Sequence, residues 1–254
     1  MSATAGRPSL RAVVFDLDDT LFDCFGQCVG PAHGEAARAM VAAGLRAAEE
    51  DVLRARLSLT GSLADVDLLV ASCFPCDDPL AAAEAGRRAF FDRDPGFVLP
   101  HPFTRSVLAA VRATALAVLV TTGSPATQRT KIERLGIAAD FDEVLLDNVF
   151  GPGSVGPGRD GGASKRDLIA SLLARRSLPP SQVLVVGDRP SSEIRAALDL
   201  GCSALRIRAG EFAGEPTPPG VPEAGDVRAV LAWLPGRGPA AMLDAGHRPG
   251  SPAR

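Results

Sequence analysis

The sequence predicts an α/β protein with a doubly wound parallel sheet, and three observations favour this fold. Three short runs are apolar throughout, which is typical of strands buried on both faces. Each run stops at small polar or acidic residues, and helical patterns separate the runs. An insertion of about eighty residues follows the first run and is rich in Ala, Arg and Glu. A chain of 254 residues is long enough for one such core with an inserted helical domain.

The predicted strands place their polar endings at one edge of the sheet. In chain order, the three main strands are 12–15, which ends in Asp16-Leu17-Asp18-Asp19-Thr20, 117–120, which ends in Thr121-Thr122-Gly123, and 183–186, which ends in Gly187-Asp188. Shorter strands are predicted at 143–146 and 204–207. In a Rossmann-like sheet the carboxyl ends of the strands form the ligand site, so the three polar endings should converge there.

Helices are predicted between these strands, because apolar residues recur there at helical spacing before a residue that ends a helix. They lie at 127–135, closed by Gly136, at 164–176, before Pro179-Pro180, at 193–200, closed by Gly201, and at 227–234. This alternation of strands and helices predicts parallel pairing with helices on both faces.

The domain organisation follows from the change in composition after residue 21. Residues 22–100 have apolar positions three and four residues apart, which predicts an α-helical cap inserted into the core. The core is then 1–21 and 101–234. Gly and Pro, 26 and 21 in number, gather in 151–162 and in the region after 209. They predict a flexible insertion and a flexible tail at 235–254.

Charge and composition exclude several classes of function. With 27 Lys and Arg against 30 Asp and Glu, the formal net charge of -3 does not favour a nucleic-acid partner. No run approaches the roughly 18 apolar residues that a membrane span needs, and the first residues lack a secretory pattern. Five cysteines, an odd number, suit a reducing compartment. We therefore expect a cytoplasmic protein with no membrane partner.

Two carboxylates follow the first predicted strand, and a third follows the last of the main strands. Asp16 and Asp18 stand two residues apart at the end of a buried run, and Asp188 ends another run. Like charges in a buried site need a compensating cation. Hard carboxylate oxygens are ligands that Mg²⁺ prefers, and they leave coordination positions for water and a phosphate oxygen. The pattern predicts Mg²⁺-assisted phosphoryl chemistry.

Four segments resemble the motifs of a known superfamily, in its order. They are Val14-Phe15-Asp16-Leu17-Asp18-Asp19-Thr20-Leu21, Val120-Thr121-Thr122-Gly123, Lys165, and Val186-Gly187-Asp188 with Glu193. Together they resemble the haloacid dehalogenase-like hydrolases, DxDxT phosphatase type, over about residues 11–234. The resemblance implies a Mg²⁺-dependent phosphatase that hydrolyses a small-molecule phosphomonoester through an aspartyl-phosphate.

The resemblance also assigns roles to individual residues. Asp16 would be the nucleophile, and Asp18 would be the general acid and base. Mg²⁺ would be held by Asp16, by the backbone carbonyl of Asp18 and by Asp188. The phosphate would be bound by Thr121, by the backbone N–H of Thr122 and by Lys165, which offsets its charge.

The chain departs from the family pattern at three places, and one assignment has a competitor. Arg166 follows the motif lysine where proline is usual, and Thr122 stands where asparagine is common. Glu193 takes the place of an aspartate, where it would reach the water shell of the metal or merely complement a helix N-terminus. Lys131, on the helix after Thr121, is the alternative to Lys165 as the functional lysine.

Other functions stay open beside hydrolysis. A phosphotransferase or phosphomutase would use the same aspartyl-phosphate, and a non-catalytic binding or regulatory protein could retain the fold. Dehalogenation is disfavoured, because the resemblance implies that dehalogenases lack the second aspartate and need no metal. The motifs encode neither the substrate nor the oligomeric state. Arg54, Arg56, Arg87, Arg88 and His33 are candidates for binding a second anionic group, although most should be solvated helix faces.

Cysteines of the predicted cap raise a second metal hypothesis. Cys24 and Cys28 are spaced C-x₃-C, and Cys73 and Cys76 are spaced C-x₂-C, with His33 nearby. This spacing would suit a structural zinc ion. The stronger interpretation is that these cysteines are small apolar residues of a helical core.

Overall fold

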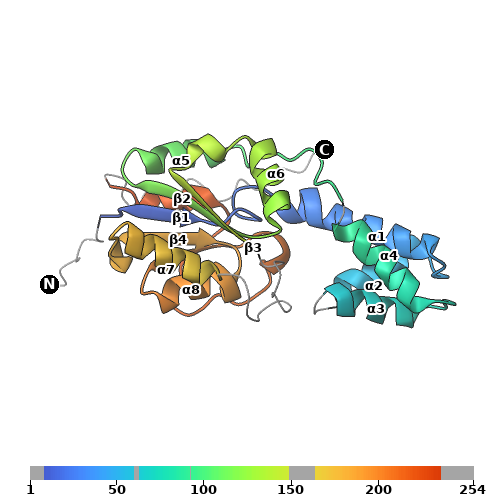
Figure 1. The fold of residues 1–254 in the computed structure, drawn as a ribbon. Coiled ribbons are helices and arrows are strands. Elements are labelled where there is room, and N and C mark those ends of the chain that lie inside the picture. Colours follow the sequence, from blue (N-terminus) through green and yellow to red (C-terminus); the bar gives the residue numbers. More distant parts are fainter. Residues whose placement is uncertain (1–8, 60–62, 92, 149–163, 236–254) are drawn as a thin grey trace, which may run out of the picture. The chain divides into compact units, whose positions relative to one another are not determined.

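A computed structural model describes residues 9–59, 63–91, 93–148 and 164–235, which form two compact units (Figure 1). The core unit comprises the described residues 9–23, 99–148 and 164–235. The helical unit comprises 24–98 except 60–62 and 92. The predicted flexible insertion at 151–162, and the predicted tail beyond Pro235, lie outside the described residues.

The core unit contains a six-stranded parallel sheet, which confirms the predicted fold class. The strand order is β3-β2-β1-β4-β5-β6, and each neighbouring pair runs parallel. The strands are β1 (Ala12–Phe15), β2 (Leu116–Gly123), β3 (Glu143–Asn148), β4 (Val183–Gly187), β5 (Ser203–Ile207) and β6 (Glu223–Ala224). The short β6 was not predicted, because two residues carry no periodicity. The order reverses between β1 and β4, which is the point where sheets of this kind bind ligands.

The central strands are buried along their whole length, as their apolar sequences require. Every residue of β1 and β4 is buried, and Phe15 lies level with Leu119 of β2 and Val186 of β4. Strand β2 runs three residues further than predicted. Thr121 and Thr122 therefore lie inside the strand and not after it, because the backbone pairs with β3 as far as Gly123. The β-branched threonines fit an extended backbone.

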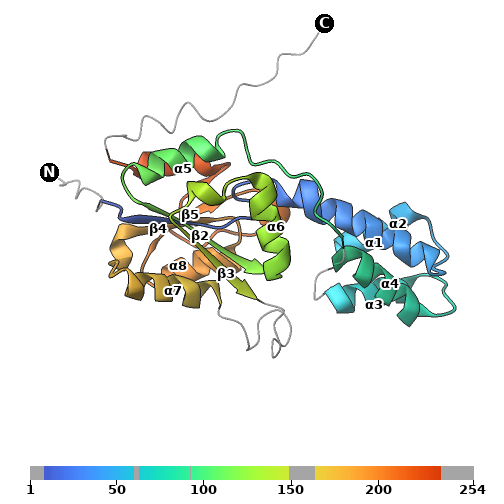
Figure 2. The ribbon, with the colours of Figure 1, turned by 45° about the horizontal axis from the view of Figure 1, so that its top comes forward.

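Helices cover both faces of the sheet, with α5 and α6 on one face and α7 and α8 on the other (Figure 1 and Figure 2). They are α5 (Thr104–Arg112), α6 (Pro125–Leu135), α7 (Lys165–Arg175) and α8 (Arg195–Asp199). Single turns of 3₁₀ or π-helix are η2 (Ala138–Asp140), η3 (Pro180–Gln182), η4 (Pro190–Ile194) and η5 (Gly210–Phe212), and the longer η6 (Val227–Trp233) is also a 3₁₀ helix.

Two predicted helices need correction. The segment expected as one helix over 193–200 is a π-helical turn, η4, that continues into the short α8. The last predicted helix, 227–234, is the 3₁₀ helix η6, whose Asp226 side chain accepts a hydrogen bond from the Arg228 N–H. Hydrophobic periodicity locates a helical segment but does not separate α, π and 3₁₀ geometry.

The helical unit contains η1 (Phe25–Val29), α1 (Gly30–Ala42), α2 (Glu49–Ser58), α3 (Leu63–Cys73) and α4 (Pro79–Phe91). Helices α1 and α4 pack closely, because Gly86 leaves room for the Met40 side chain. A Cβ at Gly86 would lie 2.6 Å from the Met40 Cγ. Arg56 is fully buried against Asp67 and is not the solvated side chain that the sequence suggests. Among the described residues, no helix has the length and apolar character to cross a membrane.

Candidate active site

Two aspartates leave neighbouring strands at the carboxyl edge of the sheet. Asp16 follows β1 and Asp188 follows β4, and these strands lie side by side. The Asp16 N–H donates to the Val186 carbonyl at 2.9 Å, which continues the pairing of β1 with β4 by one residue. Both aspartates are buried, at 5% and 4% exposed. The strand register therefore brings together two carboxylates that are far apart in the chain.

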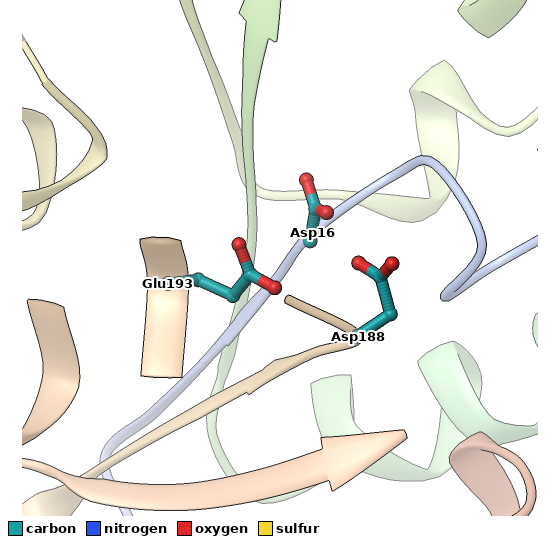
Figure 3. Close-up of side chains that lie close together, drawn as sticks. All are labelled: Asp16, Asp188 and Glu193. Carbon is teal, nitrogen blue, oxygen red and sulfur yellow. The ribbon is translucent and has the colours of Figure 1, made fainter. Parts of the chain in front are cut away.

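Glu193 is the third buried carboxylate at this edge, and Figure 3 shows its side chain beside those of Asp16 and Asp188. The turn η4 brings it back over the end of β4, where its carboxylate accepts a hydrogen bond from the Arg189 N–H. Gly187 makes this approach possible, because a Cβ there would lie 2.2 Å from the Glu193 Cγ. Ligand oxygens of the three carboxylates lie within 4.8 Å of one another.

Lys165 reaches this acidic group from the first turn of α7. Its Nζ lies 2.7 Å from Asp16 Oδ1 and 2.9 Å from Glu193 Oε2, and its side chain is 9% exposed. A capping box starts α7 one residue earlier: Ser164 accepts from the Asp167 N–H, and Asp167 accepts from the Ser164 N–H. This cap is worth about 1 kcal/mol and fixes where Lys165 leaves the helix.

Burial and like charge shift the pKa values of the acidic group upward. Burial raises the pKa of Asp16 to about 7, against the opposing effect of Lys165, and Glu193 and Asp18 add repulsion. Burial also raises the pKa of Asp188 to about 9, together with the charges of Asp16 and Glu193. Burial opposes the charged form of Lys165, but Asp16 and Glu193 outweigh it and raise the pKa of the ammonium.

The acidic group fits a divalent cation. Lys165 pairs with two of the three buried carboxylates, Asp16 and Glu193, so one cation does not balance three carboxylates when all are ionised. Within the described parts of the chain, no group donates a hydrogen bond to the Asp188 carboxylate. Carboxylate oxygens at this spacing suit Mg²⁺, which takes one or two carboxylates with water and phosphate oxygens.

The side chain of Asp18 is outside this acidic group and contacts α6. Its carboxylate accepts from Lys131 Nζ at 2.9 and 3.0 Å and from Gln128 Nε2 at 3.1 Å. Thr121 lies at the end of β2 with 1% exposure, and the Thr122 carbonyl accepts from Gln128 Nε2 at 2.8 Å. The two candidate lysines thus contact different aspartates: Lys165 contacts Asp16, and Lys131 contacts Asp18.

Arg206 is a residue of this region that the sequence prediction missed. It lies in β5 with no exposed surface, and its guanidinium donates to the backbone carbonyls of Asp188 at 3.3 Å and Phe212 at 2.7 Å. It also donates to the Glu215 carbonyl at 2.5 Å. Arg206 therefore holds the segment after β5 against the loop of Asp188. An arginine inside the apolar run 204–207 was the available signal, since buried arginine needs such partners.

The segment that Arg206 holds also contacts the loop after β1. The Glu211 N–H donates to Asp19 Oδ2 at 3.4 Å. Gly210 has a φ of 63°, and a Cβ there would lie 2.0 Å from the Asp19 carboxyl carbon. Glycine is thus required where this segment approaches Asp19.

Among the residues that the structure describes, the four cysteines of the zinc hypothesis belong to no group of three or more possible metal ligands. In the described ranges, the acidic group of Asp16, Asp188 and Glu193 is the one set of three or more His, Cys, Asp or Glu side chains close enough to hold an ion. The cysteines differ in environment: Cys24 and Cys28 are buried, whereas Cys73 is exposed and Cys76 is half-buried.

Comparisons with known proteins agree on one family. A family model described as haloacid dehalogenase-like hydrolase matches residues 10–201. The chain is 28% identical over 211 residues to the glyceraldehyde 3-phosphate phosphatase of Methanocaldococcus jannaschii, an alignment that covers 80% of this chain and 87% of the relative. It is 29% identical over 132 residues to the phosphoserine phosphatase of Thermus thermophilus, covering 52% and 49%.

A solved structure shares the fold. A haloacid dehalogenase-superfamily hydrolase of subfamily IA from Geobacter sulfurreducens superposes with a TM-score of 0.61 at 17% identity. The superposition covers 92% of this chain and 100% of that chain.

Proposed function

The chain belongs to the haloacid dehalogenase-like hydrolase family, and from this premise we propose that it is a Mg²⁺-dependent phosphatase of small phosphomonoesters. The observation that carries the proposal is the group of buried carboxylates of Asp16, Asp188 and Glu193 beside Lys165. An excess of buried negative charge at the carboxyl edge of a parallel sheet is suited to a divalent cation and a phosphate.

In the proposed reaction, Asp16 is the nucleophile and Asp18 is the general acid and base. A carboxylate oxygen of Asp16 forms a bond to phosphorus as the ester P–O bond breaks, and Asp18 gives its proton to the leaving alkoxide. Asp18 then takes a proton from water as that water attacks the aspartyl-phosphate. The Asp16–phosphorus bond breaks, which releases inorganic phosphate and restores both aspartates.

Asp16, Asp188 and the backbone carbonyl of Asp18 are the proposed ligands of Mg²⁺, and Glu193 belongs to their surroundings. When bound, Mg²⁺ would offset charge on the phosphoryl oxygens. Glu193 accepts a hydrogen bond from the Arg189 N–H, which fixes its carboxylate, and it pairs with Lys165. It therefore orients the lysine as well. This position is consistent with an outer-shell role.

Thr121, the Thr122 N–H and Lys165 are the proposed phosphate-binding groups. Thr121 and Thr122 lie in β2 just before its last residue, next to the strand that leads to Asp16. Lys165 lies 2.7 Å from the proposed nucleophile. Donors held by a strand and by a capped helix need little reorganisation when charge develops on the phosphoryl oxygens.

The named relatives favour a short substrate. Glyceraldehyde 3-phosphate and phosphoserine, named for two of them, are both three-carbon phosphomonoesters. We propose a substrate of this class, with the helical unit as the cap that excludes water. Transfer of the phosphoryl group to an acceptor other than water is the alternative that the same residues allow.

The test is Mg²⁺-dependent release of phosphate from 4-nitrophenyl phosphate. The wild type should be active with Mg²⁺ and inactive with EDTA, and Asp16→Asn should lower kcat by at least about 10⁴-fold, since it removes the nucleophile. Asp199→Asn is the matched control, because this exposed carboxylate on α8 pairs with Arg195 at the surface. A wild type that is inactive on a broad panel of phosphate esters would favour a binding or regulatory protein.

A further inference from the structure

Two donors of α6 converge on the carboxylate of Asp18. Lys131 Nζ lies 2.9 Å from Oδ1 and 3.0 Å from Oδ2, and Gln128 Nε2 lies 3.1 Å from Oδ2. Lys131 and Gln128 are three residues apart and therefore share one face of the helix. Both are buried, at 8% and 4% exposed, whereas the Asp18 side chain is 31% exposed. Both oxygens of the partly exposed Asp18 carboxylate thus accept hydrogen bonds from buried side chains of α6.

Gln128 also joins Asp18 to the end of β2. Its Nε2 donates both to Asp18 and to the Thr122 carbonyl, the latter at 2.8 Å. Gly123 has a φ of 142°, and a Cβ there would lie 3.0 Å from Gln128 Nε2. Within the described residues, the amide oxygen of Gln128 is buried without a hydrogen-bond partner. The donor end of this amide is therefore the end that the site uses.

Pro125 and the backbone of α6 place both donors. The helix starts at Pro125, two residues after β2 ends at Gly123. Gln128 and Lys131 therefore lie in its first two turns, near the end of the strand. Lys131 Nζ also lies 6.0 Å from the centre of the Phe22 ring. A buried lysine that contacts a carboxylate at two oxygens loses much of its rotational freedom.

We propose that Lys131 and Gln128 are positioning residues that fix the Asp18 carboxylate for proton transfer. The inference rests on the proposed function, because it concerns the acid and base step of that reaction. Proton transfer requires a carboxylate within hydrogen-bond reach of the leaving oxygen. Each proposed catalytic aspartate then has its own lysine, Asp16 with Lys165 and Asp18 with Lys131.

Leaving groups of different basicity test this inference. 4-Nitrophenolate departs readily without a proton, whereas phenolate depends more on the general acid. Lys131→Met should therefore lower kcat/KM for phenyl phosphate by about 10²-fold. The loss in kcat/KM for 4-nitrophenyl phosphate should be smaller by a factor of at least about five. Lys131→Arg, which keeps a cation, should recover part of the loss, and Gln128→Leu should change the two esters in the same sense as Lys131→Met.

Two controls separate positioning from a general loss of structure. Arg129→Met removes an exposed cation from the same helix and should leave both esters unaffected. In an Asp18→Asn background, Lys131→Met should not widen the difference between the two esters further, because the group that it positions is gone. The kcat/KM values report only steps up to release of the phenol, which is the step that uses Asp18 as an acid.

Each outcome decides between the proposals. An equal loss for both esters in Lys131→Met, or no loss, overturns the positioning role and leaves the phosphatase proposal intact. A wild type without Mg²⁺-dependent phosphate release from these two esters and from the broad panel of phosphate esters overturns both. A larger loss for phenyl phosphate that Lys131→Arg reduces and Arg129→Met does not reproduce supports the positioning role.

Discussion

The helical unit and the core unit both bury charged side chains, but they balance the charge differently. In the helical unit, Arg56 Nη2 lies 2.6 Å from Asp67 Oδ1, with the two side chains 0% and 1% exposed. One cation meets one anion there. In the core unit, Lys165 pairs with Asp16 and Glu193, and Asp188 is the third buried carboxyl group, so carboxyl groups outnumber cations in this group. The charges of the Arg56–Asp67 pair balance within the helical unit, whereas the core group calls for a further cation.

The contrast separates stability from function. A buried pair is weak evidence of stabilisation, because desolvation offsets much of the attraction between the charges. Burial accordingly raises the pKa of Asp67 to about 6 in spite of Arg56. The Arg56 guanidinium also lies 5.7 Å from the centre of the Phe90 ring, so its surroundings are partly apolar. We interpret this pair as a structural element of the helical unit and the core group as the reactive one.

The largest effect should come from removing a ligand of the unbalanced group. In Asp188→Asn, Mg²⁺-dependent phosphate release should fall more than about 100-fold, because loss of a mere outer-shell partner already costs about 10- to 100-fold. Without metal the same variant should melt at a higher temperature than the wild type, since the cost of burying an ionisable carboxyl group beside Asp16 and Glu193 is removed. Thermal melts with EDTA and with Mg²⁺ measure this. A variant that melts lower with EDTA and still responds to Mg²⁺ would contradict the cation site.

Breaking the balanced pair should lower stability instead. Asp67→Leu leaves Arg56 buried without its partner and should lower the free energy of unfolding by about 3–5 kcal/mol in urea titrations. The double variant Arg56→Met/Asp67→Leu should recover most of this loss. Asp77→Asn is the control, because its pair with Arg46 is exposed and should contribute less than about 1 kcal/mol. Equal losses in the single and double variants would show that the pair itself stabilises the unit.

The last prediction concerns pH in the metal-free protein. The pKa values of Asp16, about 7, and Asp188, about 9, lie above the value of roughly 4 for an unfolded aspartate. The folded state thus binds more protons, and its stability is fully present below pH 4 and declines as the pH rises through 7 and 9. Asp67 acts in the same direction near pH 6.

Melting temperatures with EDTA should therefore fall between pH 6 and pH 9, and Asp188→Asn should remove the upper part of the fall. Mg²⁺ should raise the melting temperature more at pH 9 than at pH 6, because it competes with protons for the same carboxylates. A melting temperature that rises with pH in EDTA would contradict the raised pKa values.

Much of the core was predictable, because its strands carry the signal within a few residues. The apolar runs 12–15 and 183–186 predict buried strands, and the structure confirms them as β1 and most of β4. Parallel pairing then predicts that the polar residues after these two runs lie at the same edge of the sheet. Prediction failed where geometry depends on neighbours. Thr121 and Thr122 belong to β2 because β3 extends far enough to pair with them, and 193–200 divides because Glu193 turns back over Gly187.

The sequence by itself determined the fold class, the family and the identity of the acidic residues, because short-range patterns and motif spacing encode them. Only the tertiary structure decided which groups meet. It assigned Lys165 to Asp16 and Lys131 to Asp18, although both lysines occupy helices that follow β-strands of the same sheet. It also placed Arg206 behind Asp188 and Arg56 beside Asp67. The physical reason is that the partner of a long flexible side chain depends on which charged groups lie near it, and how deeply it is buried, once the elements have packed. No local sequence pattern encodes these contacts.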